Sequence, residues 1–193
     1  MSGIAELIQR GARSARNRLS TSAHRVRGLR VQLLGVLGAA SVGARPFVGR
    51  SVRLTIYGQL TIGDNVILDD GCHIYVGPAA QVVLGDRVRV GRNTVVAAAN
   101  SIEIGNDVLI AEHCSIRDSD HQIDPDDRRH EKAAQTSPVC IGADCWLGAG
   151  VRVLRGAELG AGAIVGANAV VRGKIPARSV AVGAPARVVR QLA

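Results

Sequence analysis

The chain has few aromatic residues: its 193 residues include one Trp, one Phe and two Tyr. Aliphatic residues, alanine and glycine are abundant instead. A chain of this length can bury a core, and it suits one domain with an appendage. Because large side chains are scarce, we expect a thin, regular core built from small side chains.

The apolar run at residues 33–44 is too short to cross a bilayer. It is about twelve residues long and holds three glycines, whereas a membrane-spanning helix needs about 20 apolar residues. It also begins after some thirty residues rich in arginine, which is too late for an ordinary secretory signal. We therefore expect an intracellular, cytoplasmic chain.

Acidic residues are scarce in the first fifty positions, which contain nine arginines and a single acidic residue, Glu6. The formal charge of +8 belongs to this segment, because the remaining 15 basic and 15 acidic residues balance. Apolar residues among the arginines predict a basic amphipathic helical segment over residues 1–41. Such a helix can lie on an anionic membrane surface, or pack on the main domain or another subunit. Nucleic acid is a weaker alternative, because no recognition motif or aromatic platform accompanies the charge.

The rest of the chain is periodic, with an aliphatic residue at every sixth position. The anchors fall into sets of three: Ile62, Leu68, Ile74; Leu84, Val90, Val96; Ile104, Ile110, Ile116; Ile141, Leu147, Val153; and Leu159, Val165, Val171. A weaker set, Val42, Val48 and Leu54, precedes them. A small or β-branched residue follows most anchors by four positions, and side chains alternate across a strand, so both can point inward.

Interruptions of this period fall between the sets of three. Two extra residues lie between 54 and 62, four between 74 and 84, two between 96 and 104, and nineteen between 116 and 141. If each set is one coil, every insertion leaves at the same corner, and insertions on one side of a repeat protein commonly mark its binding side.

The cysteines also follow the period. Cys72, Cys114 and Cys145 fall at the inward small position and should act as compact apolar residues. Cys140 should point outward. The spacing of Cys140 and Cys145 is not a CxxC motif, and no zinc or disulfide framework is indicated.

The repeat resembles the hexapeptide-repeat left-handed parallel β-helix, a triangular prism with three strands per coil. The resemblance implies an all-β domain of about six coils over residues 42–190, with an extruded loop at 117–139. The left-handed crossover departs from the usual right-handed rule.

Two longer stretches resemble the maltose and galactoside O-acetyltransferases, and more closely those that modify lipopolysaccharide, capsule or exopolysaccharide sugars. They are IEIGNDVLIAEHCSIRDSDH (102–121) and the run from PVCIGADCWLGAG to GAPARVVR (138–190). The resemblance implies transfer of an acetyl group from acetyl-CoA to a sugar hydroxyl, without a metal, by a homotrimer with sites shared between subunits.

In that family a histidine at this break is the general base, which here is His121. Imidazole, with an ordinary pKa of about 6.5, is suited to take a hydroxyl proton at neutral pH. Asp118 or Asp120 could hold the imidazole in the required tautomer; two carboxylates so close in sequence leave the choice open, and we prefer Asp118.

The coenzyme residues implied by the resemblance lie in the last coils. Ala149 and Ala167 match corner positions whose backbone meets the pantetheine arm, and Ala149 N–H could stabilise an oxyanion. Arg187 and Arg190 match basic residues that meet the phosphates. Arg172-Gly173-Lys174 replaces the usual Thr-Lys, and Lys174 is kept as a candidate.

The acceptor residues depart further from the family. Gly91 stands where the galactoside enzymes have a substrate-binding asparagine, with Asn93 two residues on, which argues against small galactosides or maltose. Trp146 is expected near the histidine, with a possible contact to the acceptor. A saccharide or glycan precursor is the expected partner.

Two other classes use the same scaffold. The γ-type carbonic anhydrases bind a metal through three histidines, and here His113 and His121 are separated by seven residues, farther than in that family. A β-helix that only scaffolds partners is the third possibility, and it would not bind coenzyme A.

Overall fold

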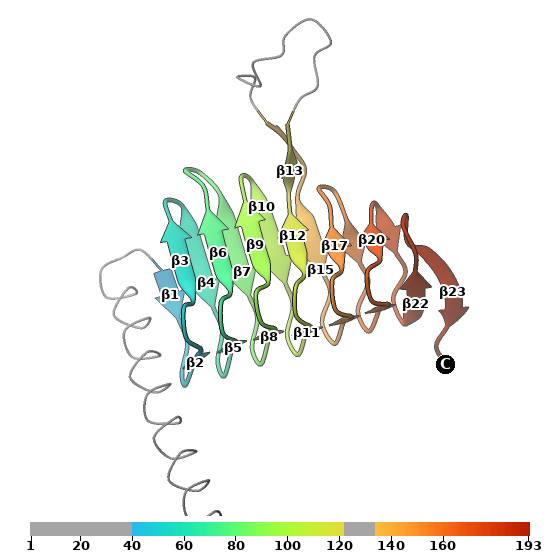
Figure 1. Ribbon diagram of the computed structural model, residues 1–193, viewed down its shortest axis with the longest axis horizontal. Coiled ribbons are helices and arrows are strands. Elements are labelled where there is room, and N and C mark those ends of the chain that lie inside the picture. Colours follow the sequence, from blue (N-terminus) through green and yellow to red (C-terminus); the bar gives the residue numbers. More distant parts are fainter. Residues whose placement is uncertain (1–39, 122–133) are drawn as a thin grey trace, which may run out of the picture.

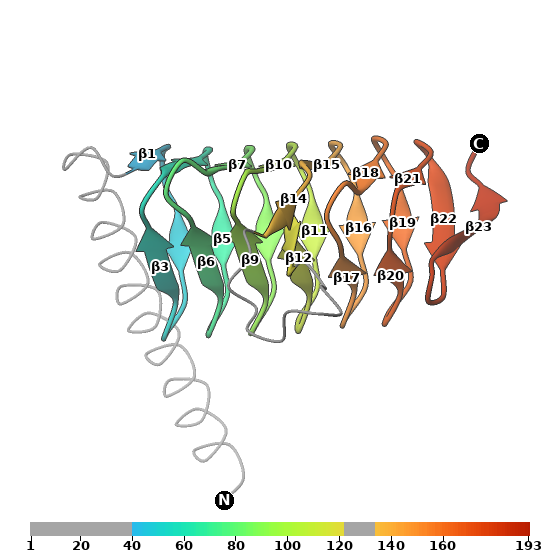
Figure 2. The same ribbon diagram turned by 90° about the horizontal axis from the view of Figure 1, so that it is seen from above.

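A computed structural model of the chain describes residues 40–121 and 134–193, and residues 1–39, with most of the expected helical segment, lie outside this range. Short strands stack as parallel coils along one axis (Figure 1). Figure 2 shows the coils following one another from β1 to β23. Among the described residues, no helix is long and apolar enough to cross a membrane.

Three parallel sheets form the sides of the prism. Sheet A contains β1 (Ala40–Val42), β4 (Gln59–Ile62), β7 (Gln81–Leu84), β10 (Ser101–Ile104), β15 (Val139–Ile141), β18 (Glu158–Leu159) and β21 (Lys174–Ile175). Sheet B contains β2 (Phe47–Val48), β5 (Ile67–Leu68), β8 (Arg89–Val90), β11 (Leu109–Ile110), β16 (Trp146–Leu147), β19 (Ile164–Val165), β22 (Ser179–Val182) and the antiparallel β23 (Arg187–Gln191). Sheet C contains β3 (Arg53–Ile56), β6 (His73–Val76), β9 (Val95–Ala98), β12 (Ser115–Arg117), β17 (Arg152–Val153) and β20 (Val170–Val171).

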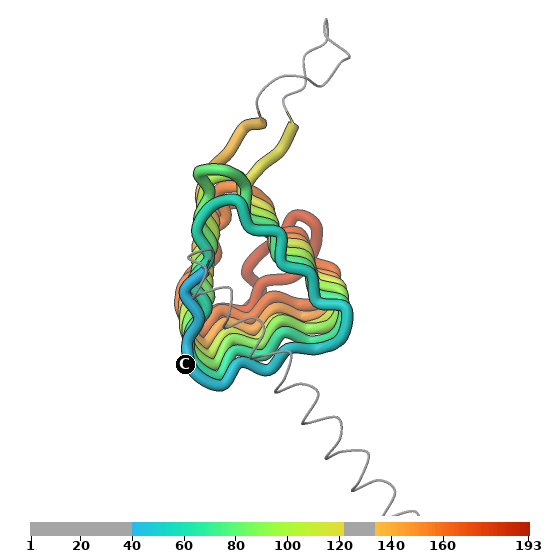
Figure 3. Tube along the Cα trace, turned by 90° about the vertical axis from the view of Figure 1, so that its left-hand side faces the viewer, coloured from blue at the N-terminus to red at the C-terminus, as the bar shows by residue number. Residues whose placement is uncertain are grey.

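The chain passes from sheet A to B to C in each coil. Seen from the N-terminal end, it runs counter-clockwise as it recedes from the viewer (Figure 3), which makes the prism left-handed. The predicted left-handed β-helix of about six coils is therefore confirmed.

All the predicted interruptions lie at the corner between sheets C and A, here called the C–A corner. Residues 57–58, 77–80 and 99–100 form its shorter turns. The longest insertion leaves between β12 and β15, and its two ends pair as β13 (Ser119–Asp120) and β14 (Gln135–Thr136). These two antiparallel strands, here called the arm, project from the prism (Figure 1).

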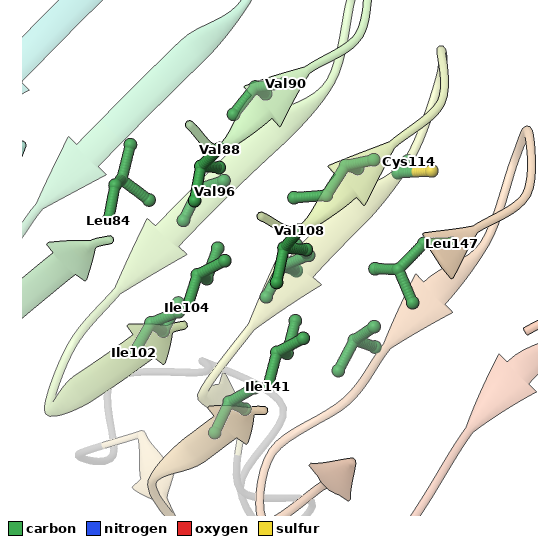
Figure 4. Packing of buried hydrophobic residues seen from close by; sticks show 14 of the residues in the cluster. Leu84, Val88, Val90, Val96, Ile102, Ile104, Val108, Cys114, Ile141 and Leu147 are labelled. Atoms are coloured by element: carbon green, nitrogen blue, oxygen red, sulfur yellow. The ribbon is translucent and has the colours of Figure 1, made fainter. Parts of the chain in front are cut away.

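The core follows the six-residue period. Leu84, Ile104 and Ile141 are in register on sheet A and are at most 2% exposed (Figure 4). Each coil thus stacks its aliphatic side chains on those of the coil before it, and such close packing stabilises a narrow core.

The cysteine predictions are confirmed. Cys72, Cys114 and Cys145 are buried, and Cys140 is exposed. The Cys114 thiol donates to the Gly148 carbonyl at 3.3 Å, and its backbone N–H donates to the Thr94 hydroxyl at 3.1 Å.

Candidate active site

His121 directly follows β13 at the base of the arm, and it is exposed. The pairing of Ser119 with Thr136 and of Asp120 with Gln135 fixes the backbone that leads to it. The histidine is thus presented to solvent at the C–A corner, beyond the end of β12.

Asp118 joins the arm to the prism. Its side chain is fully buried, and its two carboxylate oxygens accept hydrogen bonds from the N–H groups of Ala99 and Asn100 at 2.8 and 2.7 Å. Its carbonyl accepts the Ser137 N–H at 2.9 Å. Two charge-assisted hydrogen bonds compensate the burial of this carboxylate. The contacts favour a role in fixing the arm, and the orientation of His121 by Asp118 stays a prediction.

Asp120 is held by an arginine from the next coil. Arg155, which follows β17, donates from Nε to Asp120 Oδ2 at 2.9 Å and from a terminal nitrogen to Gln135 Oε1 at 3.0 Å. One guanidinium therefore contacts both strands of the arm beside His121. Arg155 cannot be recognised from the sequence, because it follows the anchor Val153 at a turn that carries no insertion and nothing in the repeat marks it.

Ala149 and Ala167 lie at the opposite edge of sheet C, at the corner between sheets B and C, here called the B–C corner. They occupy equivalent positions in successive coils, and the Asn168 N–H donates to the Ala149 carbonyl at 2.8 Å. Within residues 40–121 and 134–193, the N–H groups of Ala149 and Ala167 have no hydrogen-bond acceptor. The same position in the four preceding coils carries Arg50, Asp70, Arg92 and Glu112. Charged side chains thus give way to methyl groups at the two later positions.

The basic candidates separate into two places. Arg187 begins β23 and is in register with Val182, at the end of β22 that leads to the B–C corner. Arg190 lies farther back on the same strand, opposite Val180. Lys174 lies on sheet A and forms an ion pair with Glu158 at 2.8 Å, which raises the pKa of the ammonium group. The structure therefore places Arg187 in line with the two alanines, but not Lys174.

Asn93 also lies at the B–C corner, with a backbone φ of 54°. It lines a cavity of about 710 Å³ together with Arg92, Glu112 and His113. The cavity belongs to the coils that immediately precede Ala149. Polar side chains and an open volume at this place can hold a hydroxylated ligand.

Trp146 points outward from sheet B and is 49% exposed. Its neighbours in register are Leu109 and Ile164. An indole between two aliphatic side chains makes an apolar area beside the B–C corner, and Trp146 does not lie at the C–A corner with His121.

The candidate residues thus form two groups within one chain. The C–A corner holds Asp118, Asp120 and His121, and the B–C corner holds Asn93 and Ala149. Sheet C separates them, and a four-residue strand spans about 13 Å. In Figure 3 the arm leaves from the upper corner, and the B–C corner lies at the right.

Histidines are also kept apart. His113 lies at the B–C corner and donates its N–H to the Arg92 carbonyl, whereas His121 is on the arm. In the part of the chain that the structure describes, no group of three or more His, Cys, Asp or Glu side chains could hold a metal ion.

The prism and its corners define a class of protein, the hexapeptide-repeat transferases. The family model "Bacterial transferase hexapeptide (six repeats)" matches residues 141–173, and "Hexapeptide repeat of succinyl-transferase" matches residues 81–111.

Similarity to whole proteins is more specific. An Escherichia coli (strain K12) protein named as a lipopolysaccharide biosynthesis O-acetyl transferase, WbbJ, is 32% identical over 154 residues, which cover 74% of this chain and 79% of the relative. The chain therefore belongs to the hexapeptide-repeat acetyltransferase family, as the sequence resemblance predicted. The Mycobacterium tuberculosis protein Rv3034c, named as an acetyltransferase, is 41% identical over 75% of the chain, and the chain spans 49% of that relative's length.

Solved structures share the fold. A maltose O-acetyltransferase from Clostridium difficile 630 is 27% identical with a TM-score of 0.58, covering 81% of this chain and 72% of that one. AntD, an N-acyltransferase from Bacillus cereus crystallised with dTDP and 3-hydroxybutyryl-CoA, has a TM-score of 0.72 at 21% identity, covering 84% and 88% of the two chains.

Proposed function

We propose that the protein is an acetyl-CoA-dependent O-acetyltransferase that modifies a sugar hydroxyl of a saccharide or glycan precursor. The observation that carries the proposal is the placement of an exposed histidine, His121, on an arm anchored by Asp118 and Arg155. Membership of the acetyltransferase family and the relatives named for sugar modification support the same reaction.

His121 acts as the general base. It takes the proton of the acceptor hydroxyl while that oxygen attacks the thioester carbonyl. The new C–O bond forms as the C–S bond breaks, and the proton passes to the departing thiolate of coenzyme A. The Ala149 N–H, which is open to a ligand, stabilises the charge that develops on the carbonyl oxygen.

The coenzyme lies along the B–C corner. Ala149 and Ala167 offer backbone donors without long side chains, and Arg187 lies farther along the same line. A narrow pantetheine chain fits such a line of donors, and guanidinium groups suit its phosphates. Arg190 can add a second positive charge, and Lys174, which is paired with Glu158 on sheet A, stays a prediction.

The acceptor occupies the cavity of about 710 Å³ beside Asn93. Asn93 and its polar neighbours can hydrogen-bond sugar hydroxyls, and Trp146 extends the surface with an apolar face. The row formed by Ala149, Ala167 and Arg187 is here called the coenzyme line. The cavity adjoins this line at the B–C corner.

The catalytic site is completed by a second copy of the chain. His121 lies across sheet C from Asn93 and Ala149, so the arm of one subunit reaches the B–C corner of its neighbour. In a closed ring of three subunits, the arm of each subunit contacts the B–C corner of the next. The apolar area around Trp146 suits burial between subunits.

Residues 1–40 supply a basic peripheral membrane contact at the cytoplasmic face. This segment holds seven arginines and one glutamate. A polybasic segment gains about 1 kcal/mol per Lys or Arg near an anionic surface. Deleting residues 1–40 should weaken binding to anionic vesicles and should not change binding to neutral vesicles. Unchanged binding to anionic vesicles would remove this part of the proposal.

The reaction is tested by incubating the full chain with acetyl-CoA and a panel of saccharides. Free thiol release should depend on an acceptor, and the product should carry one added acetyl group on oxygen by mass spectrometry and NMR. Binding of coenzyme A without transfer to any hydroxyl would contradict the proposal, and failure to bind coenzyme A would favour a scaffold.

A further inference from the structure

The outer face of sheet C carries positive charge without acidic residues. Its strands contribute Arg53, His73, Arg117 and Arg152, and none of them contains Asp or Glu. Among the described residues, Arg53 and Arg117 form no ion pair; Arg117 donates only to the Ser115 hydroxyl, at 3.2 Å. Arg152 instead donates to the carbonyls of His113 and Gly150.

Partial burial, and then the positive charge that Arg53 and Arg117 give this face, lower the pKa of His73 below its ordinary value. Its Nε2 lies 3.2 Å from the Thr55 hydroxyl. Three basic side chains from β3, β6 and β12 therefore face the same solvent region, whereas the exposed Arg87 elsewhere is paired with Asp107.

Both tyrosines of the chain lie on or beside this face. Tyr57 and Tyr75 meet edge to face, with ring centroids 6.1 Å apart, and Tyr57 is 67% exposed. Tyr75 is in register with Ala97, and Ala97 with Arg117. The strands of Tyr75 and Arg117 are therefore about 10 Å apart, with only a methyl group between them.

We propose that this face binds a phosphorylated saccharide, with the phosphate at Arg53 and Arg117 and a sugar ring against Tyr75. Guanidinium groups recognise phosphate through charge-assisted hydrogen bonds, and an aromatic ring offers an apolar surface with a polar rim to a sugar. The face ends at the C–A corner, where the arm with His121 begins (Figure 1). The inference rests on the proposed function: the reacting hydroxyl lies in the cavity beside Asn93 of the neighbouring subunit, and this face holds the phosphate-bearing sugar of the same acceptor next to the arm.

The direct test is isothermal titration calorimetry on the full chain with glucose 1-phosphate, glucose and inorganic phosphate as probes. Glucose 1-phosphate should bind more tightly than either other probe. The Arg53→Gln/Arg117→Gln variant should weaken its binding about tenfold or more, which corresponds to about 1.4 kcal/mol. A matched control, Arg45→Gln/Arg87→Gln, removes the same charge elsewhere and should change binding less than about twofold.

Tyr75→Ala separates sugar recognition from anion recognition. It should weaken binding of glucose 1-phosphate and leave inorganic phosphate unaffected. The proposal would be overturned if the control variant lost as much affinity for glucose 1-phosphate as the Arg53→Gln/Arg117→Gln variant. It would also be overturned if the wild type and Tyr75→Ala both bound inorganic phosphate as tightly as glucose 1-phosphate.

The outcome can be distinguished from failure of the proposed function. If acetyl transfer to a neutral saccharide proceeds while this face binds none of the three probes, only the inference fails. If glucose 1-phosphate binds as described but no saccharide is acetylated, the proposed reaction is wrong, and the assignment of this face as a binding site for phosphorylated saccharides is upheld.

Discussion

The backbone N–H of Asn100 donates a 2.7 Å hydrogen bond to Oδ2 of Asp118. The residue at the root of the arm thus closes the corner of the coil before it. Because Asp118 is fully buried, the direction in which the arm leaves is coupled to the stability of the prism.

Replacing Asp118 should therefore affect folding. Asp118→Ala leaves two backbone donors without an acceptor, and we expect a loss of about 1–3 kcal/mol of unfolding free energy. Urea unfolding measures this loss, and Asp118→Asn should lose less because one acceptor oxygen remains. An Asp118→Asn variant with full stability but almost no turnover would instead assign Asp118 to orienting His121.

Arg155 is expected to position the arm. Arg155→Ala removes the contacts with Asp120 and Gln135, and a misplacement of about 1 Å can cost about 10²-fold in rate. Turnover should fall while the KM for acetyl-CoA stays unchanged, and Arg155→Lys should recover part of the rate. Arg172→Ala, an exposed arginine outside the arm, serves as the control. A rise in the KM for acetyl-CoA with unchanged turnover would contradict this role.

The coenzyme line can be blocked without unfolding the prism. Glu112 already occupies the position equivalent to Ala149 one coil earlier, so Ala149→Glu should fold. It should raise the KM for acetyl-CoA about tenfold or more through steric and charge repulsion. Ala143→Glu, at the corner between sheets A and B, is the matched control. Equal effects from both variants would place the coenzyme elsewhere.

Thiol reactivity tests the packing of the core. Burial raises the pKa of Cys72 to about 11 and also raises the pKa values of Cys114 and Cys145. At pH 8 these groups are protonated and enclosed, so a maleimide should label the exposed Cys140 alone. Mass spectrometry after proteolysis identifies the labelled site, and all four cysteines should react in denaturant. Rapid native labelling of Cys72 would contradict the packing.

The fold could be predicted because the information is local. Anchors such as Leu84, Ile104 and Ile141 repeat with a fixed period, and the same period sets the register between coils. Even the corner from which the arm leaves follows from where the period is interrupted.

The anchoring of the arm could not be predicted in the same way. The contact of Arg155 with Asp120 spans 35 residues and crosses the insertion, so no short pattern encodes it. Lys174 is a related case, because its pairing with Glu158 depends on two coils being stacked in register.

The most direct measurement of the shared catalytic site mixes two impaired variants. His121→Ala should lower turnover by about 10² to 10⁴-fold, and Ala149→Glu should lower the rate about tenfold or more at acetyl-CoA concentrations below KM. Co-expressed with different tags and purified as mixed rings of three, they should recover about one third of the wild-type sites, because each mixed ring has one interface with an intact His121 from one subunit and an intact Ala149 from the next. Mixed oligomers no more active than either folded variant alone would contradict a site built from two subunits.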